Sequence, residues 1–212
     1  MQLLRTRRKG SAQAAAVLSV LGLLLGLMVP RSPAQAKPKT VMVVDFADRT
    51  GNWSDTETAV TTRVISRLRG DASLRVLPRD RVQEALRAAK AETSGFIDRD
   101  DALKVAKNLE ADYVVMGEVT AFDQQHHSVC LPIGGCAESI TASVTLSGKV
   151  LNVATGQFVG EPKAEARKQQ GGVTVYTDLG DVNLEHFDDQ VIGKATLEAV
   201  DKFVRDAKSR LK

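Results

Sequence analysis

Short apolar runs rich in β-branched residues occur at several places along the chain and predict β-strands. A strand buried on both faces is a continuous apolar run, whereas a strand with one wet face alternates apolar and polar residues. Continuous apolar runs of the first kind occur in the first three of the five predicted strands. The second pattern, with hydroxyl residues at alternate positions, describes the fourth, and a turn at Ala154–Gln157 leads into a short fifth strand. The predicted strands are 40–46, 73–77, 112–122, 140–153 and 158–159.

Apolar residues at helical spacing predict four α-helices. Ser54 and Glu57 have the spacing of a capping box, so the first helix is expected to begin at this point and to end at Gly70. Acidic residues in the first turn of the third helix favour the helix dipole. The other three predicted helices are 81–90, 98–109 and, longest of all, about 188–211.

The order of these elements, β-α-β-α-α-β-β-β-α, predicts an α/β or α+β sandwich, with one mixed β-sheet and helices packed on it. The 176 residues from Lys37 to Lys212 are enough for a single domain with its own core. The long C-terminal helix is expected to dock on the sheet through one apolar face. That face consists of Val191, Ile192, Ala195, Ala199, Phe203 and Val204.

A different pattern occupies residues 1–36. Basic residues at the start are followed by an apolar stretch from Ala14 to Val29 and then by Ala34-Gln35-Ala36, a small-x-small cleavage motif. This combination is typical of a secretory signal peptide. The apolar stretch is shorter than the roughly 20 residues that a membrane-spanning helix needs. We therefore expect export to the periplasm, by either the Sec or the Tat route, and cleavage after Ala36.

The leader changes how the net charge is interpreted. The whole chain has a formal net charge of +3, but five of its 29 basic residues and none of its 26 acidic residues lie in the leader. The mature chain then has 24 basic against 26 acidic side chains, a net charge of −2. Nucleic acid is therefore not an expected partner.

Motifs that carry catalysis are absent from the sequence. It contains no G-x-S-x-G, no G-x-x-x-x-G-K-[ST] and no H-E-x-x-H. We therefore predict a protein that is not an enzyme, has no cofactor or metal, and acts by binding an envelope protein. Trp53, with the neighbouring Asn52, is the candidate partner contact, because indole side chains are common interface anchors. Its position just before a helix equally allows the indole to pack inside the domain, and of the two roles the packed one is favoured.

Both cysteines and two of the three histidines lie in the segment HHSVCLPIGGC, residues 126–136. A zinc site would use His126, His127 and both cysteines as its four ligands. An exported chain, however, enters an oxidising compartment, where thiols form disulfides. We predict a disulfide between Cys130 and Cys136 that holds a loop between two strands in one shape. Zinc binding and free thiols are the alternatives.

Four stretches of the mature chain carry a resemblance to a known family. They are VMVVDFADRTGN, LRVLPRDRVQEAL, LEADYVVMGEVTAF and VTLSGKVLNVATGQFV, of which the last two are the most specific. Through them the chain, from Lys39 to Leu211, resembles the CsgG family of periplasmic and outer-membrane proteins, named for the curli secretion channel. Related architecture occurs in the LpoB-type activators of penicillin-binding proteins.

Departures from the family pattern limit what the resemblance implies. The channel-forming member is a lipoprotein, and this chain has no cysteine at its cleavage point. That channel also extends two pairs of strands, for which the predicted loop between Phe122 and Ile140 and the polar stretch 162–185 leave no room. We expect a periplasmic binding or scaffold protein, without a direct membrane span, that supports an outer-envelope assembly or secretion process. The alternatives are a ring-forming homo-oligomer of the curli-transport type and an activator of a cell-wall synthase.

Overall fold

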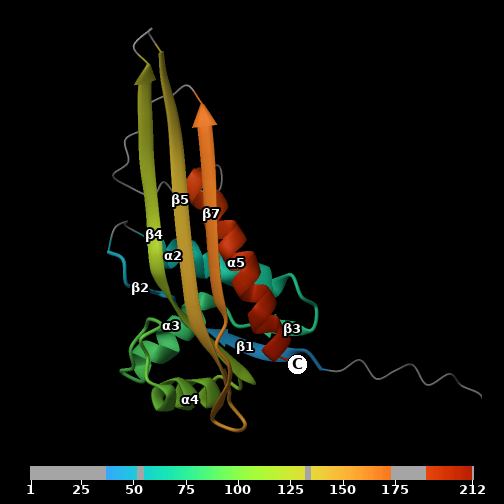
Figure 1. Ribbon diagram of the computed structural model, residues 1–212. Coiled ribbons are helices and arrows are strands. Elements are labelled where there is room, and N and C mark those ends of the chain that lie inside the picture. Colours follow the sequence, from blue (N-terminus) through green and yellow to red (C-terminus); the bar gives the residue numbers. More distant parts are fainter. Residues whose placement is uncertain (1–36, 52–54, 132–134, 173–189, 212) are drawn as a thin grey trace, which may run out of the picture. The chain divides into compact units, whose positions relative to one another are not determined.

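The computed structural model describes residues 37–51, 55–131, 135–172 and 190–211. In this part of the chain seven strands form one sheet, ordered β3-β1-β4-β5-β6, with β2 beside β4 and β7 beside β5 (Figure 1). The strands are β1 (Lys39–Val43), β2 (Ala47–Asp48), β3 (Leu74–Val76), β4 (Tyr113–Leu131), β5 (Gly135–Asn152), β6 (Gln157–Gly160) and β7 (Lys163–Gly172). The helices in the same residues are α2 (Thr56–Arg69), α3 (Arg79–Ala88), α4 (Arg99–Asn108) and α5 (Val191–Arg210).

The sheet contains both parallel and antiparallel pairs. β1 lies between β3 and β4 and is parallel to each of them, whereas β5 is antiparallel to β4, β6 and β7. The predicted fold class, one mixed sheet with helices packed on it and a long C-terminal helix, is therefore confirmed. None of the helices in the described residues combines the length and the apolar composition needed to cross a membrane.

The central strands are continuous apolar runs because helices cover both faces of this part of the sheet (Figure 1). Successive residues of a strand point to opposite faces. Val41 and Val43 of β1 pack in the core that α2 and α5 form with the sheet, and Met42 packs in the core that α3 and α4 form. All three side chains are at most 1% exposed. The sheet is thus the middle layer of three.

The C-terminal helix α5 docks on the sheet through the predicted apolar face, all six residues of which are buried. Phe203 meets Phe46 edge to face, with ring centroids 5.2 Å apart and an interplanar angle of 72°. Gly148 of β5 makes room for this ring, because a Cβ at that position would lie 2.8 Å from Cζ of Phe203. The prediction that this face docks the helix is confirmed.

The start of α2 differs from the prediction. The helix begins at Thr56, and the residue before it, Asp55, has a left-handed backbone (φ 59°) and makes no side-chain capping bond. Glu57, which was expected to close a capping box with Ser54, instead accepts a hydrogen bond from the backbone N–H of Asp48 at 3.4 Å. The capping-box prediction is therefore wrong, because Asp55 takes the N-cap position; Ser54 lies outside the described residues.

A partly buried ion pair joins the segment just after β1 to the start of α3. Nε and Nη2 of Arg79 donate to the two carboxylate oxygens of Asp45, at 2.8 and 2.5 Å. The bond to Asp45 raises the pKa of the Arg79 guanidinium, and Asp45 is only 8% exposed. A bidentate pair of this kind fixes geometry as well as charge. Both residues lie in stretches that carry the family resemblance, and in this chain they connect the segment after β1 to α3.

β4 and β5 are much longer than predicted. β4 continues past Phe122 to Leu131, and β5 begins at Gly135 rather than at Ile140. A further strand, β7, pairs with β5 in a stretch that was expected to be polar and irregular. The prediction of a loop between Phe122 and Ile140 is therefore wrong in the residues that the structure describes. The expectation that these two stretches leave no room for long strands is therefore wrong as well.

Both errors have the same physical cause. One face of the long strands packs on α5, and beyond α3 and α4 no helix in the described residues covers the other face (Figure 1). On β7, Ala164 and Ala166 are buried, while the charged residues between and beside them are exposed. Alanine is only weakly apolar, so this alternation gives little signal. On β4, residues 125–129 are exposed on both faces, and no hydrophobic pattern marks them as a strand.

Candidate functional site

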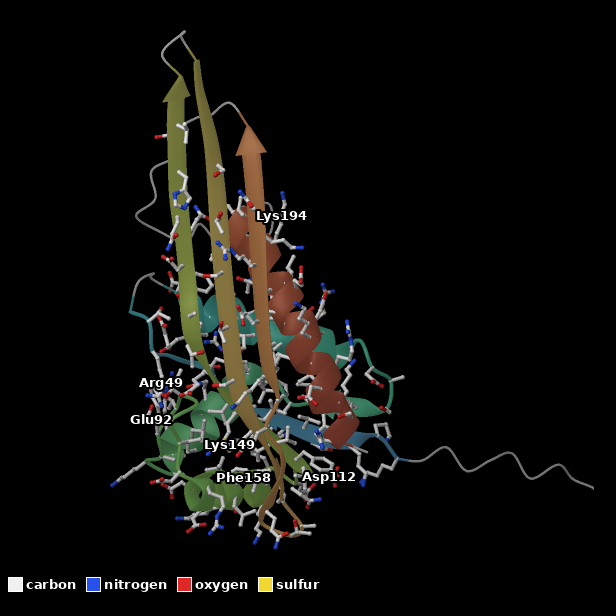
Figure 2. All side chains as sticks on the ribbon, in the orientation of Figure 1. Arg49, Glu92, Asp112, Lys149, Phe158 and Lys194 are labelled. Carbon is white, nitrogen blue, oxygen red and sulfur yellow. The ribbon has the colours of Figure 1, made fainter. Side chains whose placement is uncertain are left out.

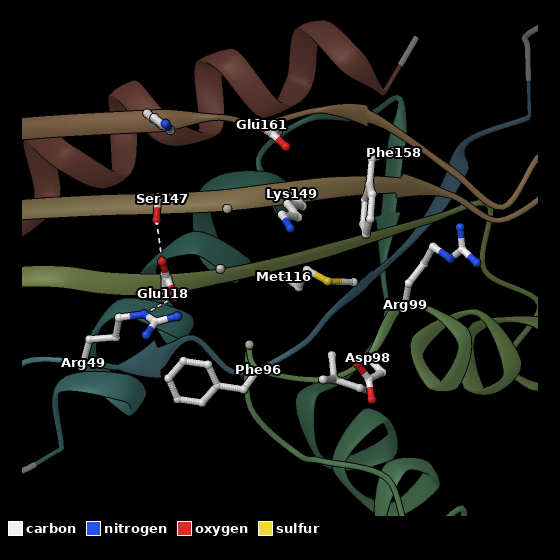
Figure 3. A pocket seen from close by; sticks show the side chains of 15 residues that line it. Arg49, Phe96, Asp98, Arg99, Met116, Glu118, Ser147, Lys149, Phe158 and Glu161 are labelled. Atoms are coloured by element: carbon white, nitrogen blue, oxygen red, sulfur yellow. Dashed lines mark hydrogen bonds and ion pairs between the residues drawn. The ribbon is translucent and has the colours of Figure 1, made fainter.

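A pocket of about 610 Å³ lies where the helix-covered part of the sheet meets its open face. Its floor is formed by Met116–Glu118 of β4 and Ser147–Lys149 of β5, and the loop 95–98 in front of α4 forms one wall. Phe158 of β6 and Arg49, the residue after β2, line the remaining sides of the pocket (Figure 3). The site thus joins segments that are far apart in the sequence.

The wall in front of α4 is held against the sheet by a backbone contact that requires glycine. A Cβ on Gly95 would lie 1.8 Å from the carbonyl oxygen of Gly117. Ser94 forms a parallel bridge with Asp45, and Nε2 of Gln83 donates to the carbonyl oxygen of Thr93 at 3.0 Å. The loop therefore lies against β4 at Gly117 and is joined to the segment after β1 and to α3, so this wall of the pocket is in place without a ligand.

Two phenylalanine rings at this site are exposed to solvent. Phe96 is 51% exposed and Phe158 is 39% exposed. Each ring carries a cation on its face. The guanidinium carbon of Arg49 lies 4.9 Å from the Phe96 centroid, and Nζ of Lys149 lies 5.2 Å from the Phe158 centroid. Figure 2 labels Arg49, Lys149 and Phe158 on this part of the molecule. The pocket therefore combines aromatic surface with positive charge.

Part of the charge in the pocket is neutralised within it. Nε of Arg49 donates to Oε2 of Glu118 in a short ion pair, and the Ser147 hydroxyl donates to Oε1 of the same carboxylate at 3.1 Å (Figure 3). Arg99 pairs with its neighbour Asp100 at 2.9 Å. This arrangement offers a ligand hydrogen-bond donors and acceptors beside Met116 and the two phenylalanine rings.

The contact residues proposed from the sequence, Asn52 and Trp53, lie outside the described residues. Arg49, three positions before Asn52, belongs to the pocket. Phe96 and Phe158 were not singled out from the sequence. The one available signal was the position of Phe158 directly after a turn, where a ring is less often enclosed than in a central strand.

The two cysteines are opposed in the sheet. In the register of β4 and β5, Cys130 pairs with Cys136, although their side chains are outside the described set. Directly opposed residues of antiparallel strands have Cα atoms about 4.5–5.5 Å apart, a separation that a disulfide can bridge. His126 and His127 are consecutive on β4 and point to opposite faces, so they do not converge on one ion. The described residues contain no group of three or more metal-binding side chains.

The sequence profile described as "Curli production assembly/transport component CsgG" matches residues 27–208. The chain belongs to the CsgG family. The resemblance seen in the sequence motifs is thereby confirmed. A search among curated protein sequences found no significant match.

Solved structures with a similar fold share little sequence with this chain. The hypothetical protein CT253 from Chlamydia trachomatis is 14% identical, with a TM-score of 0.53, over 83% of this chain and 98% of that one. The LpoB C-terminal domain from Escherichia coli is 16% identical, with a TM-score of 0.42, over 69% and 92%. The PelC dodecamer from Paraburkholderia phytofirmans is 19% identical, with a TM-score of 0.38, over 79% and 94%. At these identities the likeness concerns the fold alone.

Proposed function

We propose that this chain is a non-enzymatic periplasmic protein that acts by binding another envelope protein. It serves as a scaffold or adaptor in an outer-envelope assembly or secretion process. The observation that carries the proposal is the match to the CsgG family over residues 27–208. The signal-peptide pattern of residues 1–36 supports a place outside the inner membrane.

The pocket supports a binding role. A group of large apolar side chains exposed at one place indicates an interaction site. Aromatic residues and arginine are enriched at such sites. Phe96, Phe158 and Arg49 meet this description at one place on the molecule. The proposed contacts Asn52 and Trp53 follow Arg49 in the same segment of the chain.

A ring-forming transport component is the second candidate, and one observation favours it. From Asp123 to Leu131, β4 pairs with β5 on one side and with no strand on the other within the described residues. β7 likewise pairs only with β5 in that part of the chain. An unpaired strand edge is a template for pairing with another chain.

Photocrosslinking in a bacterium that produces the protein separates the two candidates. Benzoylphenylalanine replaces Phe96, Phe158 or Trp53, and Arg205, exposed on α5, serves as the control position. We expect crosslinks from positions 96 and 158 to a different envelope protein, identified by mass spectrometry, and none from position 205. Crosslinks to a second copy, with a multiple of the monomer mass in light scattering, would support the ring instead. Absence of any crosslink from positions 96 and 158 would contradict a binding role for the pocket.

A further inference from the structure

We propose that the ion pair between Asp45 and Arg79 positions the pocket, by fixing the loop that carries Phe96 relative to the segment that carries Arg49. The proposal rests on the proposed function, because the site that the pair positions is the one through which the chain is proposed to bind its partner. Asp45 and Arg79 are not among the described residues that line the pocket, so they act on it through the segments they join.

Four segments of the chain meet at this ion pair. The backbone of Asp45, just after β1, forms a parallel bridge with Ser94 in the loop between α3 and α4. The carboxylate of Asp45 accepts two hydrogen bonds from Arg79, the first residue of α3, at 2.8 and 2.5 Å. Nη2 of Arg79 also donates to the hydroxyl oxygen of Thr58 in α2, at 3.5 Å. The pair therefore joins the segment after β1 to two helices and, through the bridge, to the loop.

Two walls of the pocket begin within a few residues of this junction. In the loop, Phe96 is the second residue after Ser94, and in the segment after β1, Arg49 is the fourth residue after Asp45. The backbone N–H of Arg49 donates to the carbonyl oxygen of Val119 in β4 at 3.0 Å. The guanidinium of Arg49 lies over the Phe96 ring, so the two walls also meet inside the pocket (Figure 3). A shift of the loop at Ser94 therefore changes how Phe96 faces Arg49.

Each charge of the pair depends on the other. Arg79 lies in the first turn of α3, where the helix dipole disfavours a cation that has no anionic partner. Asp45 is 8% exposed, so without Arg79 its carboxylate is largely shut off from water. An unpaired carboxylate regains water only when a neighbouring segment moves. β1 and α3 both pack in the core, whereas Ser94 lies in a loop, so the loop is expected to move first.

Positioning of the pocket differs from general stabilisation of the fold in the backbone amides that it protects. Loss of a stabilising contact speeds hydrogen exchange through global unfolding, which acts on all well-protected amides alike, whereas loss of positioning opens the pocket walls alone. The wall amides are those of Ile97 and Arg49, and the sheet amides, which serve as the reference, are those of Gly148 and Val153. All four donate backbone hydrogen bonds, at 3.0–3.1 Å.

The test is hydrogen exchange followed by NMR on the ¹⁵N-labelled protein, purified from the envelope after export. In Arg79→Gln we expect exchange at the wall amides to become about tenfold faster than in the native protein, relative to the sheet amides. Arg79→Lys keeps the charge but not the bidentate bond, so its effect should be smaller than that of Arg79→Gln. The matched control is Arg67→Gln, which breaks the exposed pair between Arg67 and Asp201 and should leave the wall amides unchanged relative to the sheet amides.

Equal acceleration at the wall and sheet amides of Arg79→Gln, or none at the wall amides, would overturn the proposal. Photocrosslinking separates that result from a failure of the proposed function. If exchange contradicts positioning while the native protein still crosslinks from positions 96 and 158, the binding role stands and the ion pair only stabilises the fold. If the wall amides respond as expected but the native protein gives no crosslink from either position, the pair positions the pocket and the binding role is wrong.

Discussion

Replacing Phe203 by alanine tests how α5 is held on the sheet. The ring is fully buried, packs edge to face on Phe46 at 5.2 Å, and lies over Gly148 of β5. Removal of a buried phenylalanine side chain costs about 3–5 kcal/mol, and the cost depends on how far the neighbours can fill the cavity. Gly148 has no side chain with which to fill it. The upper half of that range, about 4–5 kcal/mol, is therefore expected.

The size of this loss is easily measured. A domain of this length has a total unfolding free energy of about 5–15 kcal/mol, so Phe203→Ala should remove a large fraction of it. Each kcal/mol lowers the melting temperature of such a domain by about 2–4 °C, which predicts a drop of about 8–20 °C. Thermal melting followed by circular dichroism measures the drop, and urea denaturation measures the free energy.

Phe96→Ala is the matched control, because it makes the same chemical change at a ring that is 51% exposed. Its cost should stay below about 1 kcal/mol, since little surface was removed from water there. If the two variants melt within about 2 °C of each other, the Phe203 ring is not part of the core in solution. The contact of this ring with the sheet would then not be what holds α5 in place.

Three further predictions follow from individual contacts. Hydrogen bonds from Lys168, and then from Lys202, lower the pKa of Glu198 to about 2. This carboxylate therefore stabilises the fold above pH 4.5 and loses its effect as the pH falls toward 2. The stabilities of the native protein and of Glu198→Gln, measured by thermal melting, should differ at pH 6 by no more than about 1 kcal/mol, because the group is so exposed, and should converge at pH 2. Gly95→Ala should move the loop off β4 and abolish crosslinking from position 96, whereas Gly70→Ala, whose Cβ would meet nothing nearer than 3.6 Å, should leave it intact. Intact-mass analysis of periplasmic protein alkylated without reductant should find no added alkyl group on Cys130 or Cys136, and two added groups would rule out the proposed disulfide, which closes so short a loop that it stabilises by only about 2 kcal/mol.

The helix-covered part of the fold was predictable because its residues carry a clear hydrophobic pattern. Continuous apolar runs gave the central strands, and the apolar face of α5 was recognised residue by residue. The far ends of β4 and β5, and the whole of β7, were missed for a physical reason. At the far end of β4 the order depends on hydrogen bonds between strands, to which any residue except proline contributes. On β7 the buried face consists of Ala164 and Ala166, which are only weakly apolar. Hydrophobic periodicity does not report such strands.

Most of the candidate site was not predictable from the sequence. Phe46, Phe122 and Phe203 are fully buried, whereas Phe96 and Phe158 are exposed, and nothing in the residue type separates the two groups. The tertiary arrangement decides which ring is covered. The pocket also depends on Gly95, whose role becomes visible only when Gly117 of a distant strand is placed against it. No sequence motif indicates which ring is covered or that Gly95 approaches Gly117.

The position of the pocket follows from the lengths of the elements. α3 and α4 have 10 residues each, whereas β4 and β5 have 19 and 18, so the two helices cover one end of the strands and leave the other end open. The loop between α3 and α4 closes on β4 at Gly117, between the buried Met116 and the partly exposed Glu118. The apolar core therefore ends inside the pocket, and the polar face begins there. Aromatic rings at such a border are covered on one side only, which explains why exposed rings and charged groups meet at this point.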